Sequence, residues 1–140
     1  MKEQTLTLRI DWSDLDLLGH VNNVAIIRYF QSARVVFSEA AGLKVFPGME
    51  TGPIEAATEV RFLKQLRYPG TVTIRTSVAE IGTTSFVLSH RITDEAGDVA
   101  VRGREVIVCF DFVRQVKMAI PPGIREKLLP FLAPADGAQV

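Results

Sequence analysis

The sequence predicts an α+β domain in which five antiparallel strands surround one long helix. Three observations support this fold class. Residues 24–41 carry apolar side chains at helical spacing, a single alternating segment precedes them, and four strand-like segments follow them. Because only short turns separate the later strands, we expect them to pair as antiparallel neighbours in one sheet.

The first strand is expected over residues 5–12, where apolar and polar side chains alternate. Its core-facing side chains would be Leu6, Leu8, Ile10 and Trp12. Polar and turn-forming residues follow, and either Asn22 or Asn23 can cap the helix that comes next.

The long helix is predicted from an apolar stripe with spacings of three and four residues. Gly42 supplies a left-handed stop at its end. The glycine- and proline-containing stretch 46–53 cannot continue a helix, so it is expected to be a loop that could border a pocket. The stripe consists of Ile26, Phe30, Ala33, Phe37, Ala40 and Ala41.

The remaining strands are expected at 55–66, 71–81, 84–93 and 99–112. Gly103 suggests a β-bulge in the last of them. The apolar run 106–110 does not alternate, which indicates a strand covered on both faces. A single helix covers only one face, so the run suggests a partner subunit.

The chain ends with two prolines followed by a short helical stretch, residues 124–132. No linker or repeat divides the sequence. We therefore expect one domain over residues 1–132, with a polar tail over residues 133–140.

Composition limits the classes of function. The 16 basic and 16 acidic residues give a net charge of zero, which disfavours nucleic-acid binding and attraction to anionic membranes. Neither a signal peptide nor an apolar run of membrane-spanning length is present, so a cytoplasmic protein without membrane insertion is expected. The only cysteine, Cys109, lies in an apolar run and is interpreted as a buried structural residue.

The most informative stretch is residues 12–23, which contains Asp14-Leu15-Asp16-Leu17-Leu18-Gly19 followed by His20-Val21-Asn22-Asn23 just before the helix. With Tyr29-Phe30 on the helix, this motif resembles the signature of the 4-hydroxybenzoyl-CoA thioesterase family of hotdog-fold proteins. The resemblance extends over nearly the whole chain. It implies a hotdog fold, with a five-stranded antiparallel sheet wrapped around one long central helix, and an acyl-CoA thioesterase that forms a homodimer or homotetramer.

In that family the second aspartate of the motif is catalytic, which maps onto Asp16. Thioester cleavage needs a carboxylate that attacks the carbonyl or activates water, together with donors for the developing oxyanion. The amides around Asn23 and Val24, at the helix start, are candidates for those donors. Gly19 would let the backbone approach closely. No cofactor and no metal is implied.

Other residues near the motif have less direct expected roles. His20 would orient Asp16 or contact the thioester, and Asn22 would cap the helix or contact substrate. Asp14 is better explained by local hydrogen bonding. Six basic residues are candidates for binding phosphates of the substrate, although each could equally be a solvated strand charge: Arg61, Lys64, Arg67, Arg91, Arg102 and Arg104. The acyl group could therefore be carried by CoA or by a carrier protein.

Two alternatives remain open from the sequence. A hotdog hydratase or dehydratase would need an acid/base histidine, and His90 would have to reach the site, although its place on the apolar phase of a strand favours a hydrogen-bonded core residue. A non-catalytic acyl-CoA-binding module would keep the pocket without turnover. A metal site is disfavoured, because the spacing of Asp14, Asp16 and His20 does not fit a calcium loop.

Overall fold

A computed structural model describes residues 1–134 of the chain. An antiparallel sheet with the strand order β1-β3-β4-β5-β2 forms most of the molecule, and the short strand β6 pairs with β5. The elements are β1 (Gln4–Arg9), η1 (Trp12–Asp14), α1 (Asn23–Ala41), β2 (Thr51–Phe62), β3 (Thr71–Ile81), β4 (Ser85–Thr93), β5 (Val99–Asp111), β6 (Val116–Lys117), α2 (Pro122–Leu128) and η2 (Leu129–Phe131).

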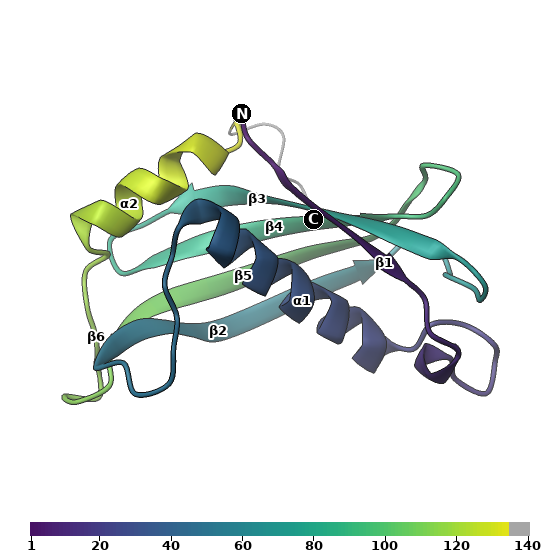
Figure 1. Cartoon of the computed structure of the whole chain (residues 1–140), viewed down its shortest axis with the longest axis horizontal. Helices are drawn as coiled ribbons and strands as arrows, with labels where there is room; N and C mark the ends of the chain where they lie inside the picture. The colour runs from purple at the N-terminus through teal and green to yellow at the C-terminus, as the bar shows by residue number, and fades with distance from the viewer. Residues whose placement is uncertain (135–140) are drawn as a thin grey trace.

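The helix α1 lies across one face of the sheet, and the shorter α2 lies beside β3 at one end of the sheet (Figure 1). The predicted antiparallel sheet is confirmed, and α1, with 19 residues, occupies the predicted position in the chain. No helix within residues 1–134 is both long enough and apolar enough to cross a bilayer.

The apolar stripe of α1 faces the sheet, as its spacing predicts, except for Ala40, which is exposed because it lies to one side of the buried face. Ile26, Phe30, Ala33 and Phe37 are each at most 2% exposed and pack against the inner faces of the strands. Burying such side chains stabilises the fold by roughly 1.5–3 kcal/mol for each of the larger ones. Cys109 is buried in the same core, at 5% exposure.

Both ends of α1 are set by local chemistry. The Asn22 side chain accepts a hydrogen bond from the Ala25 amide (2.9 Å), which makes Asn22 the N-cap. Gly42 has φ = +77° and ends the helix in the left-handed region. The start of α1 is therefore fixed beside the motif that precedes it.

The predicted bulge at Gly103 is wrong. Gly103 pairs regularly with Val60 and His90, and the irregularities of register fall elsewhere, for example between Glu55 and Ala57. A Cβ at Gly103 would collide with the Phe30 ring. The glycine is thus required by the close approach of α1 to β5.

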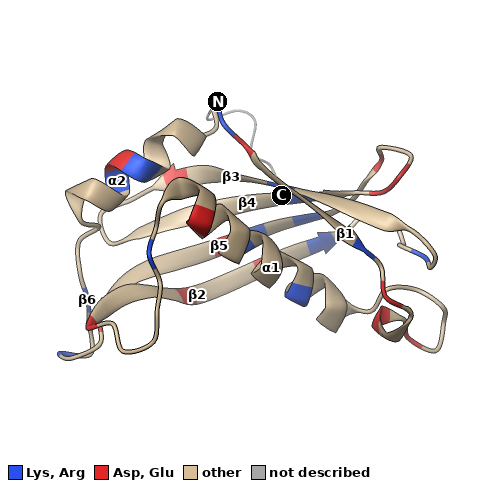
Figure 2. Ribbon diagram, viewed as in Figure 1, with Lys and Arg blue, Asp and Glu red and all other residues tan. Residues whose placement is uncertain are grey.

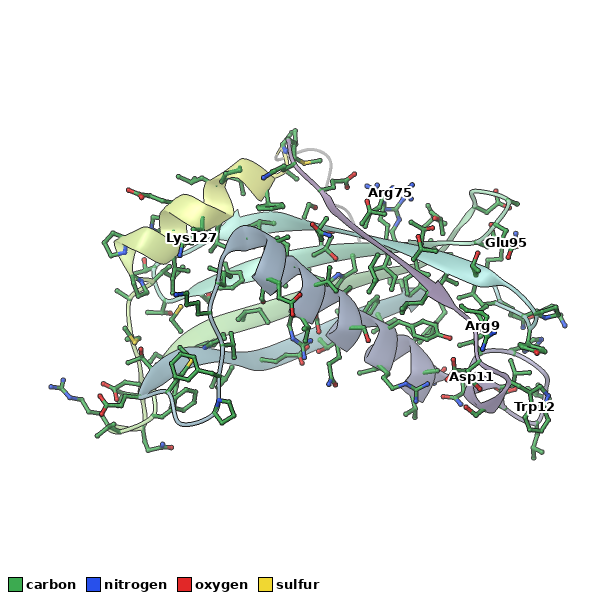
Figure 3. All side chains as sticks on the ribbon, in the orientation of Figure 1. Arg9, Asp11, Trp12, Arg75, Glu95 and Lys127 are labelled. Atoms are coloured by element: carbon green, nitrogen blue, oxygen red, sulfur yellow. The ribbon has the colours of Figure 1, made fainter. Side chains whose placement is uncertain are left out.

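The first strand is shorter than predicted, because it ends at Arg9. Asp11 caps η1, and the Asp14 side chain accepts in turn from the Asp11 amide, so a capping box replaces the last residues of the expected strand. Trp12 is 72% exposed and projects away from the core (Figure 3). Its predicted place on the inner face is therefore wrong.

Strand β2 begins four residues earlier than predicted and forms an edge of the sheet that is exposed along almost its whole length. By contrast, much of the run 106–110 is buried within the single chain, with Val108 at 9% exposure. The run alone therefore does not require a partner subunit, whereas the open edge of β2 leaves one row of backbone groups unpaired.

The C-terminal helix is confirmed, although it begins at Pro122 and ends in the 3-10 turn η2. In the predicted tail, the Ala133 amide donates to the Val78 carbonyl (2.8 Å). The rest of that prediction, residues 135–140, lies outside the described part of the chain.

Candidate active site

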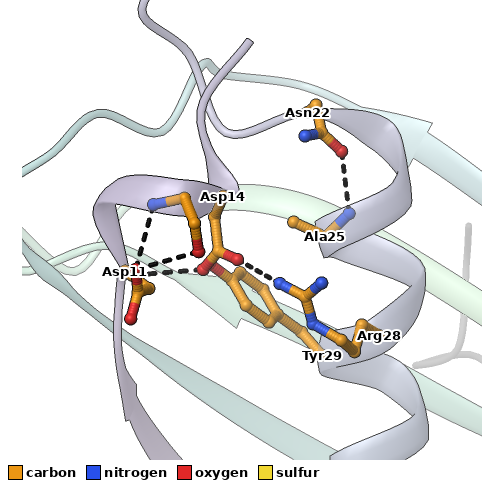
Figure 4. A network of polar contacts seen from close by, with 7 residues as sticks. Asp11, Asp14, Asn22, Ala25, Arg28 and Tyr29 are labelled. Carbon is orange, nitrogen blue, oxygen red and sulfur yellow. Dashed lines mark hydrogen bonds and ion pairs between the residues drawn. The ribbon is translucent and has the colours of Figure 1, made fainter.

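The loop between β1 and α1 is fastened to the helix by Asp14, which is 4% exposed. Its Oδ2 accepts from the Tyr29 hydroxyl (2.7 Å) and from the Asp11 amide (3.1 Å), and its Oδ1 accepts from Arg28 (Figure 4). Burial and this hydrogen bond to Asp14 raise the pKa of Tyr29, so its hydroxyl remains a donor. The local role predicted for Asp14 is thus present.

The far end of the loop is also held. The Asn22 amide donates to the Asp14 carbonyl (3.0 Å), and the Val21 amide donates to the Leu66 carbonyl (2.9 Å). These bonds fix the loop between α1 and the segment that follows β2. A side chain in this loop therefore has a defined position relative to the helix start.

Asp16 lies in the middle of this fastened loop and is exposed. Its Oδ1 accepts from the Leu18 amide (2.8 Å) and from the His20 amide (3.3 Å). No hydrogen bond to Oδ2 occurs within residues 1–134. One carboxylate oxygen is thus held by the loop, and the other is available to a ligand.

Gly19 makes the loop turn possible. Its φ is +79°, a conformation that other L-residues rarely adopt, and its amide donates to the Asp16 carbonyl (3.1 Å). A Cβ placed on Gly19 would meet no atom within 4 Å. Within this chain, the turn conformation rather than a close approach accounts for the glycine.

The first turn of α1 offers two free amides. The Ala25 amide is taken by the Asn22 side chain, and the Ile26 amide donates to the Asn22 carbonyl (3.2 Å). The amides of Asn23 and Val24 have no hydrogen-bond partner within residues 1–134. They carry the partial positive charge of the helix N-terminus, which favours an anionic oxygen at this end.

A pocket of about 540 Å³ brings part of the predicted site together. Asp16, His20 and Asn23 line it, together with Ile26 from the first turns of α1. The other predicted residues do not line it. Gly19 forms the turn of the loop and Asn22 caps the helix. Val24 is exposed on the helix, and Arg61 and Arg67 lie outside the pocket. Arg67 is nevertheless close, because its backbone pairs with His20.

Apart from Lys64, a candidate for phosphate binding, the residues of the opposite wall of this pocket were not predicted from the sequence. This wall is formed by the residues from Phe62 to Leu66, with Val101 from β5. Within it, Lys64 is paired with Asp94 (2.5 Å) and Asp98 (2.8 Å), and these two carboxylates raise the pKa of its ammonium group. No local pattern signals this wall, because the segment was expected to continue β2.

A second, larger pocket of about 880 Å³ lies beside the C-terminal half of α1. It is mostly apolar, with polar groups contributed by Arg34 and Glu55. The loop expected to border a pocket does so here. Its apolar lining includes Val35, Phe46, Met49, Ile54, Leu88 and Met118.

His90 is buried in the core at 1% exposure, as predicted, and lines neither pocket. Its Nδ1 is 2.8 Å from the Thr76 hydroxyl, and its Nε2 is 2.6 Å from Glu105. Glu105 is also paired with Arg34 (2.5 Å). Burial, assisted by the positive charge of Arg34, lowers the pKa of His90, so its ring stays neutral.

These contacts permit one type of chemistry at the smaller pocket. Asp16 and Asn23, whose amide is free, line the same pocket, and acyl transfer requires such a pairing of a nucleophile or base with a donor for the oxyanion. The buried His90 is not positioned to act on a ligand in this pocket. No observation therefore favours the hydratase alternative.

Comparisons with known proteins agree with the fold. A predicted thioesterase from Bacillus stearothermophilus is 28% identical, with a TM-score of 0.84 over 94% of this chain and 98% of that one. A Staphylococcus aureus protein solved in complex with CoA has a TM-score of 0.85 at 14% identity, covering 93% and 84% of the two chains. A 1,4-dihydroxy-2-naphthoyl-CoA thioesterase from Synechocystis has a TM-score of 0.84 at 12% identity, covering 95% and 100%.

No curated protein sequence gives a significant match. The family comparison is decisive, because the family model of the Thioesterase-like superfamily matches residues 10–128, which span the Asp16 loop, α1 and the whole of β2 to β5. This match confirms the predicted enzyme class, a thioester hydrolase. The chain belongs to the Thioesterase-like superfamily.

Proposed function

We propose that the chain is an acyl-CoA thioesterase of the 4-hydroxybenzoyl-CoA type within the hotdog fold, with Asp16 as its catalytic carboxylate. One observation carries the proposal: Asp16 and the start of α1 border the same pocket, with the Asn23 and Val24 amides free. Asp16 either attacks the thioester carbonyl or removes a proton from the attacking water. The reaction yields a free acid and a thiol.

The local contacts assign distinct tasks to the residues around Asp16. The Leu18 and His20 amides orient the Asp16 carboxylate, since both donate to Oδ1. The amides of Asn23 and Val24 would receive the carbonyl oxygen as it becomes negative. His20 lines the same pocket and would contact the thioester. Asn22 acts through the helix cap.

The substrate is an acyl thioester of CoA or of a carrier protein. Two structural neighbours, one solved with CoA and one named as a CoA thioesterase, support a CoA substrate. The backbone of Arg67 pairs with that of His20, and Arg61 is the last residue but one of the exposed strand β2, which supports both as candidates for binding phosphates of the substrate.

A homodimer formed through β2 would complete the site. The exposed edge of β2 would pair with a second copy of itself in the antiparallel sense and satisfy its unpaired backbone groups. The smaller pocket uses the end of β2 at Phe62, and the larger pocket uses the other end, Thr51 to Glu55. Antiparallel pairing brings the small pocket of one copy next to the large pocket of the other.

The two pockets are separate within a single chain. Ile26 of the small pocket and Arg34 of the large pocket are eight helical residues, or about 12 Å, apart along α1. In the dimer, an acyl chain leaving the carbonyl site near Asp16 would enter the apolar pocket of the partner. This arrangement surrounds the long helices of both copies with one continuous sheet.

The experiment is a thiol-release assay with a series of acyl-CoA substrates of graded chain length and aromatic character. We expect the protein to hydrolyse at least one substrate. The rate should saturate with substrate concentration and should need no added cofactor. If no substrate in the series, nor the same acyl groups on a carrier protein, released thiol, the proposal would be wrong. Tight acyl-CoA binding without turnover would identify a non-catalytic binding module instead.

A further inference from the structure

Four arginines stand directly opposite one another across four neighbouring strands. Arg61 of β2 pairs with Arg102 of β5, Arg102 pairs with Arg91 of β4, and Arg91 pairs with Arg75 of β3. We call these four residues the arginine row. Directly paired side chains point to the same face of a sheet, so the row forms one line. At about 4.8 Å between strands, it is roughly 14 Å long.

The row lies on the face of the sheet that α1 does not cover. The neighbours of these arginines along the strands, Ile74, Ile92 and Val101, are buried against α1, and successive residues of a strand alternate between faces. Figure 2 shows basic segments on neighbouring strands, and Figure 3 shows Arg75 directed away from α1. Among residues 1–134, no element covers the row, so it is open to a partner on the outer face.

The positive charge of the row is only partly compensated. Arg61 pairs with Glu59 (3.4 Å) and Arg91 with Glu3 (3.2 Å). Arg75 donates only to the Thr93 hydroxyl (3.3 Å), and Arg102 makes no ion pair or side-chain hydrogen bond within residues 1–134. Like charges placed directly opposite one another destabilise a sheet. Although the chain has no net charge, the arginine row thus brings like charges close together and should destabilise the sheet there.

The shape of the surface favours a protein over a small anion. Small ligands usually bind in concave pockets, whereas the row runs straight across a sheet face and lines neither of the two pockets described above. An acidic helix has the matching geometry, because carboxylates on one side recur about once per turn, every 5.4 Å. That spacing is close to the distance between neighbouring strands.

We propose that the arginine row is the docking surface for a carrier protein that presents an acidic helix and delivers the acyl thioester to the site. The inference rests on the proposed thioesterase function and makes a protein-bound thioester the substrate. Arg61 connects the row to the site, since the next two residues, Phe62 and Leu63, line the pocket that contains Asp16. The flexible arm of the carrier would pass round this end of β2.

The test compares the wild type with the double variant Arg75→Thr/Arg102→Thr, which removes the two arginines without ion pairs. Arg114→Thr/Lys117→Thr, at exposed positions in the β5–β6 turn and in β6, is the control, because it also removes two positive charges. Binding of acyl carrier protein without an acyl group is measured by calorimetry at low and high salt. Turnover is measured with the same acyl group on carrier protein, on CoA and on pantetheine, which lacks the nucleotide.

The proposal predicts that the double variant binds the carrier protein at least about tenfold more weakly, the effect of losing one charge-assisted contact or more. Salt should weaken the wild-type complex and have less effect on the variant. Hydrolysis of acyl-pantetheine should be unchanged, and the melting temperature should stay equal or rise because repulsion is relieved. The control should match the wild type in all assays.

Two results would overturn the proposal. One is carrier binding that is undetectable, or that is equal in the wild type and the double variant. The other is a loss of activity toward acyl-CoA but not acyl-pantetheine, which would make the row a site for nucleotide phosphates. Failure of the thioesterase proposal gives a different result, because no thioester of any kind would then be hydrolysed. The binding of carrier protein to the wild type and to the double variant would still test the arginine row.

Discussion

At the scale of single residues, the two aspartates of the motif have different environments. Asp14 is buried and accepts hydrogen bonds from three donors, whereas Asp16 is exposed and binds only backbone amides of its own loop. The first fastens the loop to α1. The second remains available for chemistry. Substitutions at the two positions should therefore affect different properties.

Asp14→Ala should destabilise the fold. It leaves the buried Tyr29 hydroxyl without an acceptor and removes the partner of Arg28, which together should cost about 2–4 kcal/mol. Urea denaturation of the variant and of Asp16→Ala measures the difference. Asp16→Ala, at an exposed position, should stay within about 1 kcal/mol of the wild type. Equal losses of stability would contradict the structural role given to Asp14.

At the scale of secondary-structure elements, the start of α1 positions the proposed oxyanion amides. Asn22→Ala removes the cap from the Ala25 amide and should cost about 1 kcal/mol, whereas Asn22→Ser keeps a capping oxygen. If Asn22 acts only as a cap, serine should restore both stability and kcat. Thermal melts and steady-state kinetics on the pair decide this. Restored stability with a low kcat would instead indicate direct contact with substrate.

The buried His90 of β4 contacts Thr76 of β3 and Glu105 of β5, and its burial should make the stability of the fold depend on pH. Burial lowers the pKa of His90, so below about pH 6.5 the unfolded chain takes up a proton that the folded chain excludes. The contribution of His90 to the free energy of unfolding is therefore fully present above about pH 6.5. It falls as the pH is lowered, by up to about 1.4 kcal/mol per pH unit. His90→Gln lacks this contribution. Urea unfolding measures the difference in free energy of unfolding between the wild type and His90→Gln. This difference should be smaller in mild acid than near neutrality. An equal difference at both pH values would contradict the role given to His90.

Several elements could be predicted from the sequence because their signals are local. The apolar stripe and Gly42 define α1, and alternation with short turns defines β3 and β4. The end of β1 was mispredicted because a side-chain capping box at Asp11 and Asp14 replaced strand pairing. The start of β2 was missed because an exposed edge strand need not alternate, and Gly52 and Pro53 resemble a turn.

The part of the candidate site that is local in the sequence could also be predicted. Asp16, His20 and Asn23 are close in the sequence, so a turn before a helix brings them together. Residues 62–66 and Val101 reach the same pocket only through the register of β2 on β5 and the contacts between the loop and Leu66. Such long-range pairing leaves no local pattern. The arginine row depends on strand register in the same way.

At the scale of the whole molecule, the proposed dimer predicts complementation between two inactive variants. Asp16→Asn removes the catalytic carboxylate, and Val35→Trp fills the large apolar pocket that Val35 lines. If each site combines the small pocket of one chain with the large pocket of its partner, half of the sites in a mixed dimer are intact. Refolding the two variants together should restore about a quarter of wild-type activity.

The activity of separately refolded and then mixed variants provides the control, because their dimers should not exchange at once. Light scattering should give the mass of two chains, or of four if dimers associate further. An absence of any recovered activity in confirmed mixed dimers would place both pockets of one site in a single chain, or make the large pocket irrelevant to catalysis.

The most direct test of the central claim is kcat for Asp16→Asn on the best thioester substrate. The asparagine Oδ1 can still accept from the Leu18 and His20 amides, so the loop keeps its shape while the charge is lost. We expect kcat to fall by about 10²–10⁴ while the melting temperature stays unchanged. A kcat within a few fold of the wild type would contradict it.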